Sequence, residues 1–452
     1  MKTRFSMVEN STMNGCDAFV VIGAQYGDEG KGAQVGNLAA ELSSRGKCVI
    51  GIRSNGGSNA GHTVYVNGLK LATHQVPIAC LYVGDTWGLI GPGAVLNLTS
   101  LRKELNDLES KLGWSVVSKL FFSPKLPVTS AVHVHLDSVN VANLGSTAQA
   151  IGPTYEDRVG RRGLYTVDLF RPENDLIAML EKLYAFHGVT RETPVFAEML
   201  KTDLANFGWF CETFSRHLID PYDFVASKSP ATLLIEGANA LALDNVDGGT
   251  PYVTSSCTTL GGVISGSGLG THALRHLWND NFELIYVMKG SYTTRVGTGT
   301  LVTQRDDEHG DKLQKLGSEF GVTTGRKRRT GDLDLVQIKH MMSRYLVPEH
   351  TVLNLTKLDI SSAFDTVDVC VAYESLPEHT KNYPANDDEL THVKPVYQQF
   401  PGWKDFDFST VKSYEDLHPN VKSLIRFIET YLGVPVKYIN LGPNEGQYII
   451  KQ

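Results

Sequence analysis

A glycine-rich stretch near the N-terminus carries residue types that can hold a phosphate and do chemistry beside it. Residues 23–32 have the sequence Gly-Ala-Gln-Tyr-Gly-Asp-Glu-Gly-Lys-Gly. Glycine lets backbone N–H groups approach a phosphate closely, because it accepts a positive φ and has no Cβ. Asp28 and Lys31 would add a carboxylate and an ammonium group. A Walker A loop is excluded, since Gln25 and Gly32 stand where that pattern needs Gly and Ser or Thr. A purely structural glycine turn is the alternative.

Three further stretches have the chemistry of nucleotide or anion binding. Lys357 and Asp359 follow an apolar segment; an aspartate can accept both N1–H and 2-amino hydrogens of guanine, and a lysine stem can cover the base. Residues 326–329 are Arg-Lys-Arg-Arg, and arginine forks fit carboxylates and phosphates. His62 lies in the glycine-rich stretch 54–63, and next to a phosphate loop it could donate to a phosphoryl oxygen. Each stretch has a structural alternative. Lys357 and Asp359 could be a surface ion pair, residues 326–329 a solvated basic loop, and His62 a buried structural histidine.

The elements that must position these residues alternate between apolar strands and amphipathic helices. Residues 18–22 predict a buried strand before the first glycine loop, and apolar residues at 35, 38, 39 and 42 predict a helix after it. The alternation favours an α/β fold with a large, mostly parallel central sheet flanked by helices. Further strands are predicted at 48–53, 64–66, 69–71, 87–90, 119–122, 232–235, 282–288, 352–355, 367–372 and 436–439, and helices at 101–112, within 172–222, after 331 and at 421–432.

Ligands of such sheets gather at the carboxyl ends of the strands. The glycine loops after Ile22 and Arg53, the turn after Ile235 and the Lys357–Asp359 segment are expected at such ends. Asn67 and Gly68, between two short apolar runs, predict a type I′ hairpin. Residues 145–163 and 321–331 are rich in Gly, Thr and Arg without periodicity, so both are expected to be long loops.

Composition argues against a nucleic-acid-binding, a disulfide-rich secreted or a membrane-spanning protein. The 452 residues carry a formal net charge of −7, which argues against a nucleic-acid-binding surface. Six scattered cysteines without a CxxC pair indicate reduced thiols, a cytoplasmic setting and no structural zinc site. Residues 1–15 have no apolar core of a signal peptide and are expected to be a disordered tail. No apolar run approaches the roughly 20 residues of a membrane span.

Considered together, the motifs resemble the adenylosuccinate synthetase family, and the chain is identified as a divergent member of it. The resemblance implies one catalytic domain over 16–452, a P-loop-NTPase-like glycine loop, a cytoplasmic homodimer and the substrates IMP, GTP and L-aspartate. In that reaction GTP phosphorylates O6 of IMP, and the aspartate amino group then displaces phosphate to give adenylosuccinate. The matching stretches are 27–32, 56–63, 152–163, 236–238, 253–256, 292–297, 319–331, 356–359 and 401–403.

The resemblance also implies a role for each matching residue. Asp28 would be the general base and a Mg²⁺ ligand together with the Gly61 carbonyl, while His62 and Lys31 would act on the transferring phosphoryl group. GTP contacts would come from Gly27, Glu29, Gly30, Lys31, Gly32, Gly61, His62, Thr63, Arg328, Lys357, Asp359, Asn440 and Gly442. IMP contacts would come from Asp28, Asn59, Thr147, Arg161, Asn239, Thr254 and Arg326, with Arg161 reaching the partner's site. Aspartate contacts would come from Thr323, Thr324, Arg326 and Arg328.

Several positions depart from the family pattern and keep other hypotheses open. Ala33 replaces a lysine, Ala148-Gln149 a Gly-Arg pair that helps to bind aspartate, Asn239 a glutamine, Asp332 a tryptophan and Asn440 a serine. One alternative is the same chemistry on another purine nucleotide such as dGMP, as in phage 2-aminoadenine pathways. The enzymes of those phage pathways have serine at the position of Asp28. The aspartate in this chain therefore favours IMP as the substrate. The other alternative, a non-catalytic GTP-binding homologue, is disfavoured by intact Asp28, Lys31 and His62.

Overall fold

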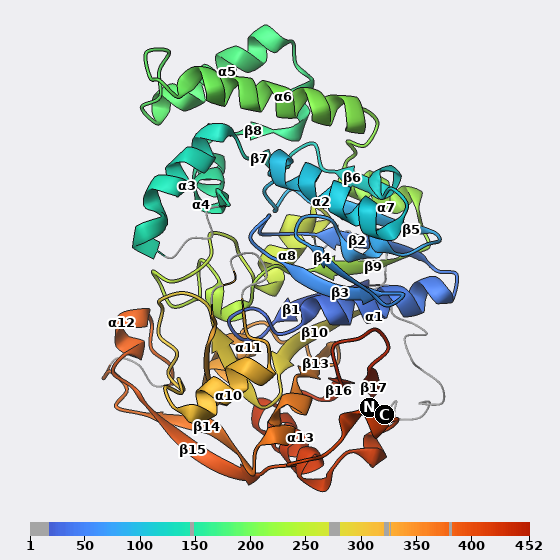
Figure 1. Cartoon of the computed structure of the whole chain (residues 1–452), viewed down its shortest axis with the longest axis vertical. Helices are drawn as coiled ribbons and strands as arrows, with labels where there is room; N and C mark the ends of the chain where they lie inside the picture. Colours follow the sequence, from blue (N-terminus) through green and yellow to red (C-terminus); the bar gives the residue numbers. More distant parts are fainter. Residues whose placement is uncertain (1–17, 145–148, 271–280, 321–324, 326, 379–381) are drawn as a thin grey trace, which may run out of the picture.

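A nine-stranded sheet runs through the middle of the molecule (Figure 1). The computed structural model describes residues 18–144, 149–270, 281–320, 325, 327–378 and 382–452. The strand order is β17-β16-β13-β10-β1-β9-β2-β5-β6, and neighbouring strands are parallel except β16 and β17. The strands are β1 Ala18–Gly23, β2 Cys48–Arg53, β5 Thr86–Ile90, β6 Leu120–Phe122, β9 Ala231–Glu236, β10 Phe282–Lys289, β13 Thr351–Thr356, β16 Val436–Asn440 and β17 Tyr448–Ile450.

The central strands are continuous apolar runs because helices cover both faces of the sheet. In β1, Phe19 and Val21 belong to one hydrophobic core, whereas Ala18, Val20 and Ile22 belong to the core on the other face. The helices are α1 Lys31–Ser44, α2 Leu98–Leu112, α3 Ala131–Leu144, α4 Ile151–Val159, α5 Glu173–Phe186, α6 Phe196–Phe214, α7 Pro221–Ser227, α8 Leu260–Ser267, α10 Glu308–Leu316, α11 Leu335–Ser343, α12 Asp387–Leu390 and α13 Pro419–Leu432. The predicted parallel α/β sheet is confirmed.

A second sheet of four strands contains the strand predicted at 367–372 and corrects part of the loop expected over 321–331. Its order is β11-β12-β14-β15, with β11 Tyr292–Arg295, β12 Arg329–Asp334, β14 Thr366–Glu374 and β15 Lys394–Pro401. Residues 367–372 therefore do not join the central sheet. Residues 329–331 form a strand instead of a loop, because their backbone pairs with 293–295 of β11. That partner lies more than thirty residues away in the chain, and local composition carries no sign of it.

The expected loop over 145–163 is also wrong in part, since α4 occupies Ile151–Val159. Pro153 lies in the first turn, where its missing N–H costs no helical hydrogen bond. Ile151 and Tyr155, four residues apart, bury one face of the helix. Tyr155 also accepts a hydrogen bond from the Gly56 N–H at 3.0 Å. Tertiary packing thus overrides a composition that is unfavourable for a helix.

Two smaller pairs of strands complete the fold. The hairpin of β3 His62–Val66 and β4 Leu69–Thr73 turns at Asn67 and Gly68, whose φ angles of 49° and 80° confirm the predicted type I′ turn. The strands β7 Pro127–Val128 and β8 Leu164–Tyr165 form the other pair. Figure 1 shows α3 to α6 gathered at one end of the molecule and β14, β15 and α13 at the other. Within the described ranges, no helix is both long and apolar enough to span a membrane.

Candidate active site

The four expected ligand-facing segments follow strands of the same parallel sheet. β9 pairs with both β1 and β2, and β10 lies between β1 and β13. Parallel strands end at the same edge, so the loops after β1, β2, β9 and β13 lie along one edge of the sheet. This confirms the predicted common location of the glycine loops, the turn after Ile235 and the Lys357–Asp359 segment.

The first glycine loop is built around a buried carboxylate. Gly27, Asp28 and Gly30 have φ angles of 94°, 60° and 98°, so the backbone curls through the left-handed region three times. Glu29 is fully buried and its Oε1 accepts the N–H of Gln25 at 3.2 Å and of Gly27 at 2.7 Å. The side chain of Glu29 therefore faces into the loop and stabilises its shape.

The helix that follows begins with Lys31 and packs against the strand that carries His62. Lys31 Nζ lies 2.8 Å from Glu29 Oε2, so the lysine is held at the loop. A Cβ on Gly32 would come within 2.9 Å of His62 Cβ and 3.0 Å of the Thr63 carbonyl oxygen. Gly32 thus permits the close packing that brings the predicted phosphate loop and His62 together.

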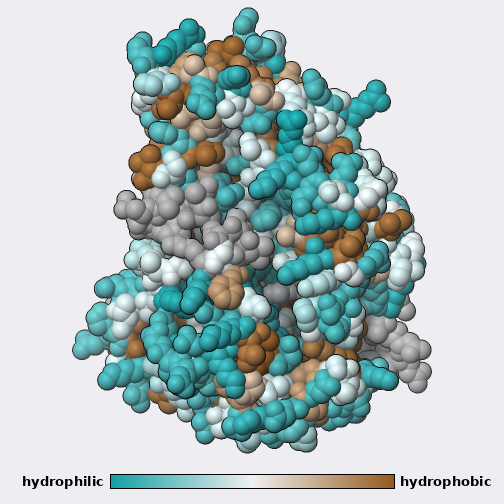
Figure 2. All heavy atoms as spheres, in the orientation of Figure 1, coloured by the Kyte–Doolittle hydropathy of each residue, from teal (hydrophilic) through white to brown (hydrophobic). Residues whose placement is uncertain are grey.

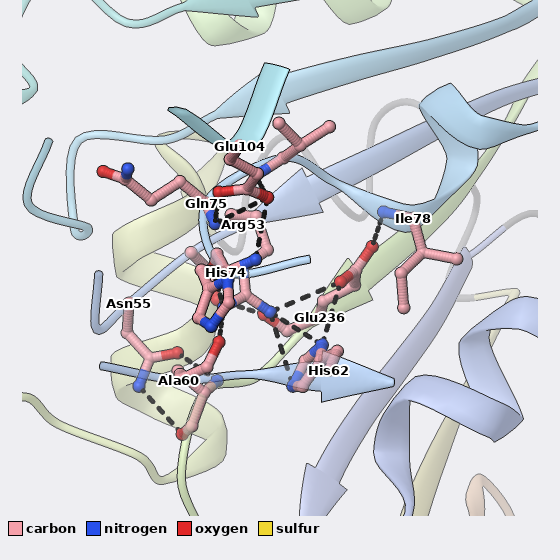
Figure 3. Close-up of polar contacts among 12 residues, drawn as sticks. Arg53, Asn55, Ala60, His62, His74, Gln75, Ile78, Glu104 and Glu236 are labelled. Carbon is pink, nitrogen blue, oxygen red and sulfur yellow. Dashed lines mark hydrogen bonds and ion pairs between the residues drawn. The ribbon is translucent and has the colours of Figure 1, made fainter. Parts of the chain in front are cut away.

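His62 lies in a buried polar network that Figure 3 shows in close-up. Arg53 Nη1 lies 2.8 Å from His62 Nδ1, and Arg53 also donates to the carbonyl oxygens of His74 at 2.7 Å and Ala60 at 3.3 Å. Glu236 Oε2 lies 3.4 Å from both Arg53 Nη1 and His62 Nδ1. Because a guanidinium group only donates, the short contact makes Nδ1 an acceptor and leaves the imidazole hydrogen on Nε2.

Burial, together with the charges of this network, keeps His62 neutral. Burial, and then the positive charges of Arg53 and Lys31, hold the pKa of His62 well below its usual value. Burial raises the pKa of Glu236 to about 7, against the opposing effect of Arg53. Glu236 Oε1 accepts the Ile78 N–H at 2.7 Å, which fixes the carboxylate. A neutral Nε2–H imidazole is a hydrogen-bond donor suited to a phosphoryl oxygen.

Sequence reasoning assigned no role to Arg53, to Glu236 or to a third buried group, Glu104. Glu104 accepts the backbone N–H groups of residues 74–76 at 2.8 to 3.3 Å, and this segment supplies the His74 carbonyl that holds Arg53. A sequence signal did exist for Arg53. It is a charged residue at the end of an apolar strand, directly before a glycine loop.

Asp28 and Arg328, predicted to act on different substrates, lie against each other. Asp28 Oδ2 is 2.7 Å from Arg328 Nε, and the side chain of Asp28 is 30% exposed. Arg328 Nη1 also donates to Glu319 Oε2 at 2.7 Å. The predicted base is therefore open to solvent on one side and paired with an arginine on the other.

Asn59 and Asn239, predicted to contact IMP, meet at the second glycine loop: Asn59 is part of it and Asn239 lies against Gly56. A Cβ on Gly56 would lie 3.6 Å from Asn239 Oδ1 and 3.7 Å from Asn59 Oδ1. Asn239 has a φ of 58°, and its Oδ1 is buried without a hydrogen bond from any described residue. Asn55 Nδ2 joins this region to the segment after Thr254 through the Ala238 and Cys257 carbonyls, at 3.3 and 3.2 Å.

The predicted guanine pocket lies at the ends of β13 and β16, which are neighbours in the sheet. Lys357 follows β13 and Asp359 lies in the short helix η5 (Leu358–Ala363), which Trp403 Nε1 holds by donating to the Leu358 carbonyl at 2.9 Å. Burial raises the pKa of Asp359, and Lys357 opposes that shift. Asn440 ends β16, and its buried Oδ1 has no hydrogen-bond partner among the described residues.

Among the remaining predicted residues, Gly61, Thr63, Thr254 and Gly442 are half-buried, one is exposed and four are undescribed. Arg161 is exposed just after α4 and has a φ of 59°. Thr147, Thr323, Thr324 and Arg326 lie outside the described residues. Asp332, at a position where the family usually has tryptophan, lies in β12 of the second sheet and accepts from Arg305 Nε at 2.8 Å. Burial raises the pKa of Asp332 to about 6.

Comparisons with known proteins identify the family. The family model described as adenylosuccinate synthetase matches residues 20–449. The chain belongs to the adenylosuccinate synthetase family. It is 39% identical to the adenylosuccinate synthetase of Pyrenophora tritici-repentis over 444 residues, 96% of this chain and 99% of the relative. The predicted family resemblance is confirmed.

Solved structures agree with this assignment. The fully ligated adenylosuccinate synthetase of Plasmodium falciparum superposes with a TM-score of 0.84 at 32% identity, covering 96% of this chain and 100% of that chain. The succinoaminodeoxyadenylate synthetase of cyanophage S-2L, bound to dGMP and dATP, matches with a TM-score of 0.58 at 16% identity, over 96% and 95% of the two chains. The second likeness shows a shared fold alone.

Proposed function

We propose that this adenylosuccinate synthetase family member ligates L-aspartate to IMP in a GTP-dependent reaction that gives adenylosuccinate, GDP and phosphate. The observation that carries the proposal is the family match over residues 20–449. The assembly of Asp28, Lys31 and His62 at one edge of the sheet supports it. These are the three residue types that base catalysis and phosphoryl stabilisation require at one place.

In the proposed mechanism Asp28 accepts the N1 proton of IMP while O6 attacks the γ-phosphoryl group of GTP. The side chain of Asp28 is 30% exposed, so the hypoxanthine ring of IMP can reach it from the solvent side. Arg328 is paired with its other side. The His62 Nε2–H donates to the transferring phosphoryl group. The Lys31 ammonium group contacts the phosphates, either in place of its ion pair with Glu29 or in addition to it. The Arg328 guanidinium group binds the carboxylates of L-aspartate. In the second step the neutral aspartate amino group bonds to C6, phosphate departs with the electrons of the C6–O bond, and the new amino nitrogen releases one proton.

The Asp28 carboxylate and the Gly61 carbonyl are the groups that we propose as ligands of a magnesium ion. The Asp28 carboxylate and the Gly61 carbonyl are hard oxygen ligands of the kind Mg²⁺ prefers. Asp28 is partly exposed next to the phosphate loop, so one carboxylate oxygen can reach a metal ion. When bound, Mg²⁺ would offset charge on the GTP phosphates.

IMP is the acceptor that the relatives favour over dGMP. The proteins at 32% and 39% identity are adenylosuccinate synthetases. Asn239 is one methylene shorter than the usual glutamine, and its unpaired buried Oδ1 supports a contact to the purine. Asn59, Thr254 and the undescribed Thr147 and Arg326 would complete the IMP contacts. Thr323 and Thr324 would contact aspartate.

We further propose a single catalytic domain over 16–452 that acts as a cytoplasmic homodimer. Arg161 is exposed, as a residue that reaches a partner's site must be. Large apolar side chains are exposed at the same end of the molecule, where Figure 2 shows hydrophobic surface over the upper helices. They include Val134, Val139, Val159, Phe170 and Phe186, with exposed fractions of 43% to 81%. Such a surface suits burial against a second copy.

One assay tests the function. Purified protein with Mg²⁺ and GTP is offered IMP or dGMP, with and without L-aspartate, and products are followed by mass spectrometry. We expect adenylosuccinate from IMP only when aspartate is present. A dGMP–aspartate adduct alone would establish the phage-type alternative. The absence of an adduct from either purine would leave only the non-catalytic GTP-binding alternative.

A further inference from the structure

A buried carboxylate to which no role has been given lies among three cations. Glu319 is fully buried, and its Oε1 accepts from the Tyr292 hydroxyl at 2.6 Å and lies 3.0 Å from Lys289 Nζ. Its Oε2 accepts from Arg328 Nη1 at 2.7 Å. Lys357 Nζ is 3.8 Å from Oε1. We refer to these five residues as the Glu319 cluster.

The Glu319 cluster joins several elements at the edge of the two sheets. Lys289 ends β10, Tyr292 begins β11, and Lys357 follows β13. Burial alone would raise the pKa of Glu319, but the charges of Lys289, Lys357 and Arg328 outweigh it and lower the pKa to about 2. A buried carboxylate is tolerated only with such compensation, so removing its charge leaves its cations without a partner.

Glu319 fixes the direction of Arg328. The two residues are joined twice, because the Arg328 N–H donates to the Glu319 carbonyl at 3.0 Å and the side chains pair at 2.7 Å. Arg328 Nε also lies within ion-pair distance of Asp28, 2.7 Å from Oδ2. A continuous series of charged contacts thus runs from Asp28 through Arg328 and Glu319 to Lys357.

We propose that Glu319 is a positioning residue that holds Arg328 against Asp28 and connects this pair to Lys357. The proposal rests on the proposed function for the roles of Asp28, Arg328 and Lys357. Glu319 is fully buried, so we assign it a positioning role and no substrate contact. It links the group that meets the guanine base to the group that accepts the IMP proton, so that both are in place before reaction.

The Glu319→Gln variant tests this, because a carboxamide has a single acceptor oxygen. That oxygen can serve either Arg328 or the Tyr292 and Lys289 side, and the amide NH₂ then faces another donor. We expect kcat to fall about 10- to 100-fold and the KM for aspartate to rise, with the KM for IMP nearly unchanged. The matched control is Glu308→Gln, the same change at an exposed position of α10, which should behave as wild type.

A double-mutant cycle with Arg328→Lys separates positioning from general destabilisation. If Glu319 acts through Arg328, the double variant is hardly worse than the worse single variant. Independent, multiplying effects would overturn the proposal, and so would a wild-type kcat in Glu319→Gln. If Glu319→Gln does not fold, Glu319→Asp keeps the charge, withdraws it by one methylene and enters the same cycle.

A crystal structure of the unliganded variant supplies a readout that needs no turnover. We expect Arg328 Nε to move beyond ion-pair distance of Asp28 Oδ2 in Glu319→Gln. An arginine that stays at its wild-type position would overturn the proposal even if the wild-type enzyme makes adenylosuccinate. Conversely, a wild-type protein that makes no adduct would refute the proposed function, whereas the Arg328 displacement would still report on Glu319.

Discussion

Asp28, the predicted general base, is paired with an arginine. Arg328 Nε lies 2.7 Å from Asp28 Oδ2, and a general base must give up that pairing in part to receive a proton. The left-handed φ of 60° aims this side chain outward from a loop whose other carboxylate, Glu29, faces inward. Two adjacent acids in one loop therefore take different roles because the backbone turns between them.

The first prediction concerns Asp28→Asn. The amide cannot accept the N1 proton, so turnover should fall by at least about 10²- to 10⁴-fold. GTP affinity, measured by calorimetry, should remain close to wild type because the loop is shaped by Glu29. Asp107→Asn, on an exposed turn of α2, is the control. Wild-type-like turnover in Asp28→Asn would refute the base assignment.

The second prediction concerns the guanine pocket. Asp359→Asn replaces an acceptor of two guanine hydrogens by an amide that can donate to O2 of xanthine. The ratio of kcat/KM for GTP over XTP should therefore fall by about 10- to 100-fold. Asp365→Asn, on a side chain that is 78% exposed, is the matched control. An unchanged nucleotide preference in Asp359→Asn would count against the pocket.

At the scale of elements, buried carboxylates fix the ends of helices. Asp203 of α6 is 2% exposed and accepts the Ala131 N–H at the start of α3 at 2.8 Å, as well as the Tyr184 hydroxyl at 2.6 Å. Burial raises the pKa of Asp203 to about 7, against the lowering effect of these hydrogen bonds. The carboxyl therefore binds its proton more tightly in the folded protein than in the unfolded chain.

The third prediction is the pH dependence that follows. A carboxyl whose folded pKa is raised contributes most stability below its unfolded pKa of about 3.9 and loses it as pH rises to the folded pKa. Asp203 should thus lower the free energy of unfolding between pH 4 and 7, by up to about 1.4 kcal/mol per pH unit. In urea titrations across this range, Asp203→Asn should lose that part of the slope. Parallel curves for both proteins would contradict the prediction.

At the scale of the whole molecule, the end formed by α3 to α6 carries the exposed Arg161. Asp157 near the end of α4 accepts from His133 Nε2 at 2.9 Å, His187 Nε2 at 2.7 Å and Arg162 Nε at 2.9 Å. His133, Asp157 and His187 could also surround a metal ion, but the Arg162 guanidinium already neutralises the carboxylate. We interpret the cluster as a support for the turn that presents Arg161.

The fourth prediction tests the exchange of Arg161 between subunits. Asp28→Asn and Arg161→Leu homodimers should each be nearly inactive. A mixed dimer has one site with native Asp28 and native Arg161, so an equimolar mixture after subunit exchange should regain about one quarter of wild-type activity. Each variant mixed with itself is the control. If Arg161 served its own subunit, no mixed dimer would hold an intact site and activity would not return.

The sequence by itself determined the parallel α/β class, the first glycine loop and the family. Strong local signals carry each of these: continuous apolar strands such as 18–22, glycines where φ is positive, and motifs in a fixed order. The strands β1, β2 and β9 were predicted almost to the residue for that reason. The hairpin at Asn67 and Gly68 was equally local.

Only the tertiary structure decided which charges meet. The second sheet, the packing of α4, the contact of Arg53 with Glu236, and the contacts of Glu319 with Lys289, Tyr292 and Lys357 all depend on partners that are distant in the chain. Local composition does not predict such pairings. Arg328 could be predicted as an anion-binding residue, but its contact with Asp28 could not, because they are 300 residues apart. Buried ion pairs form where folding brings opposite charges together out of water, and that meeting is a property of the whole fold.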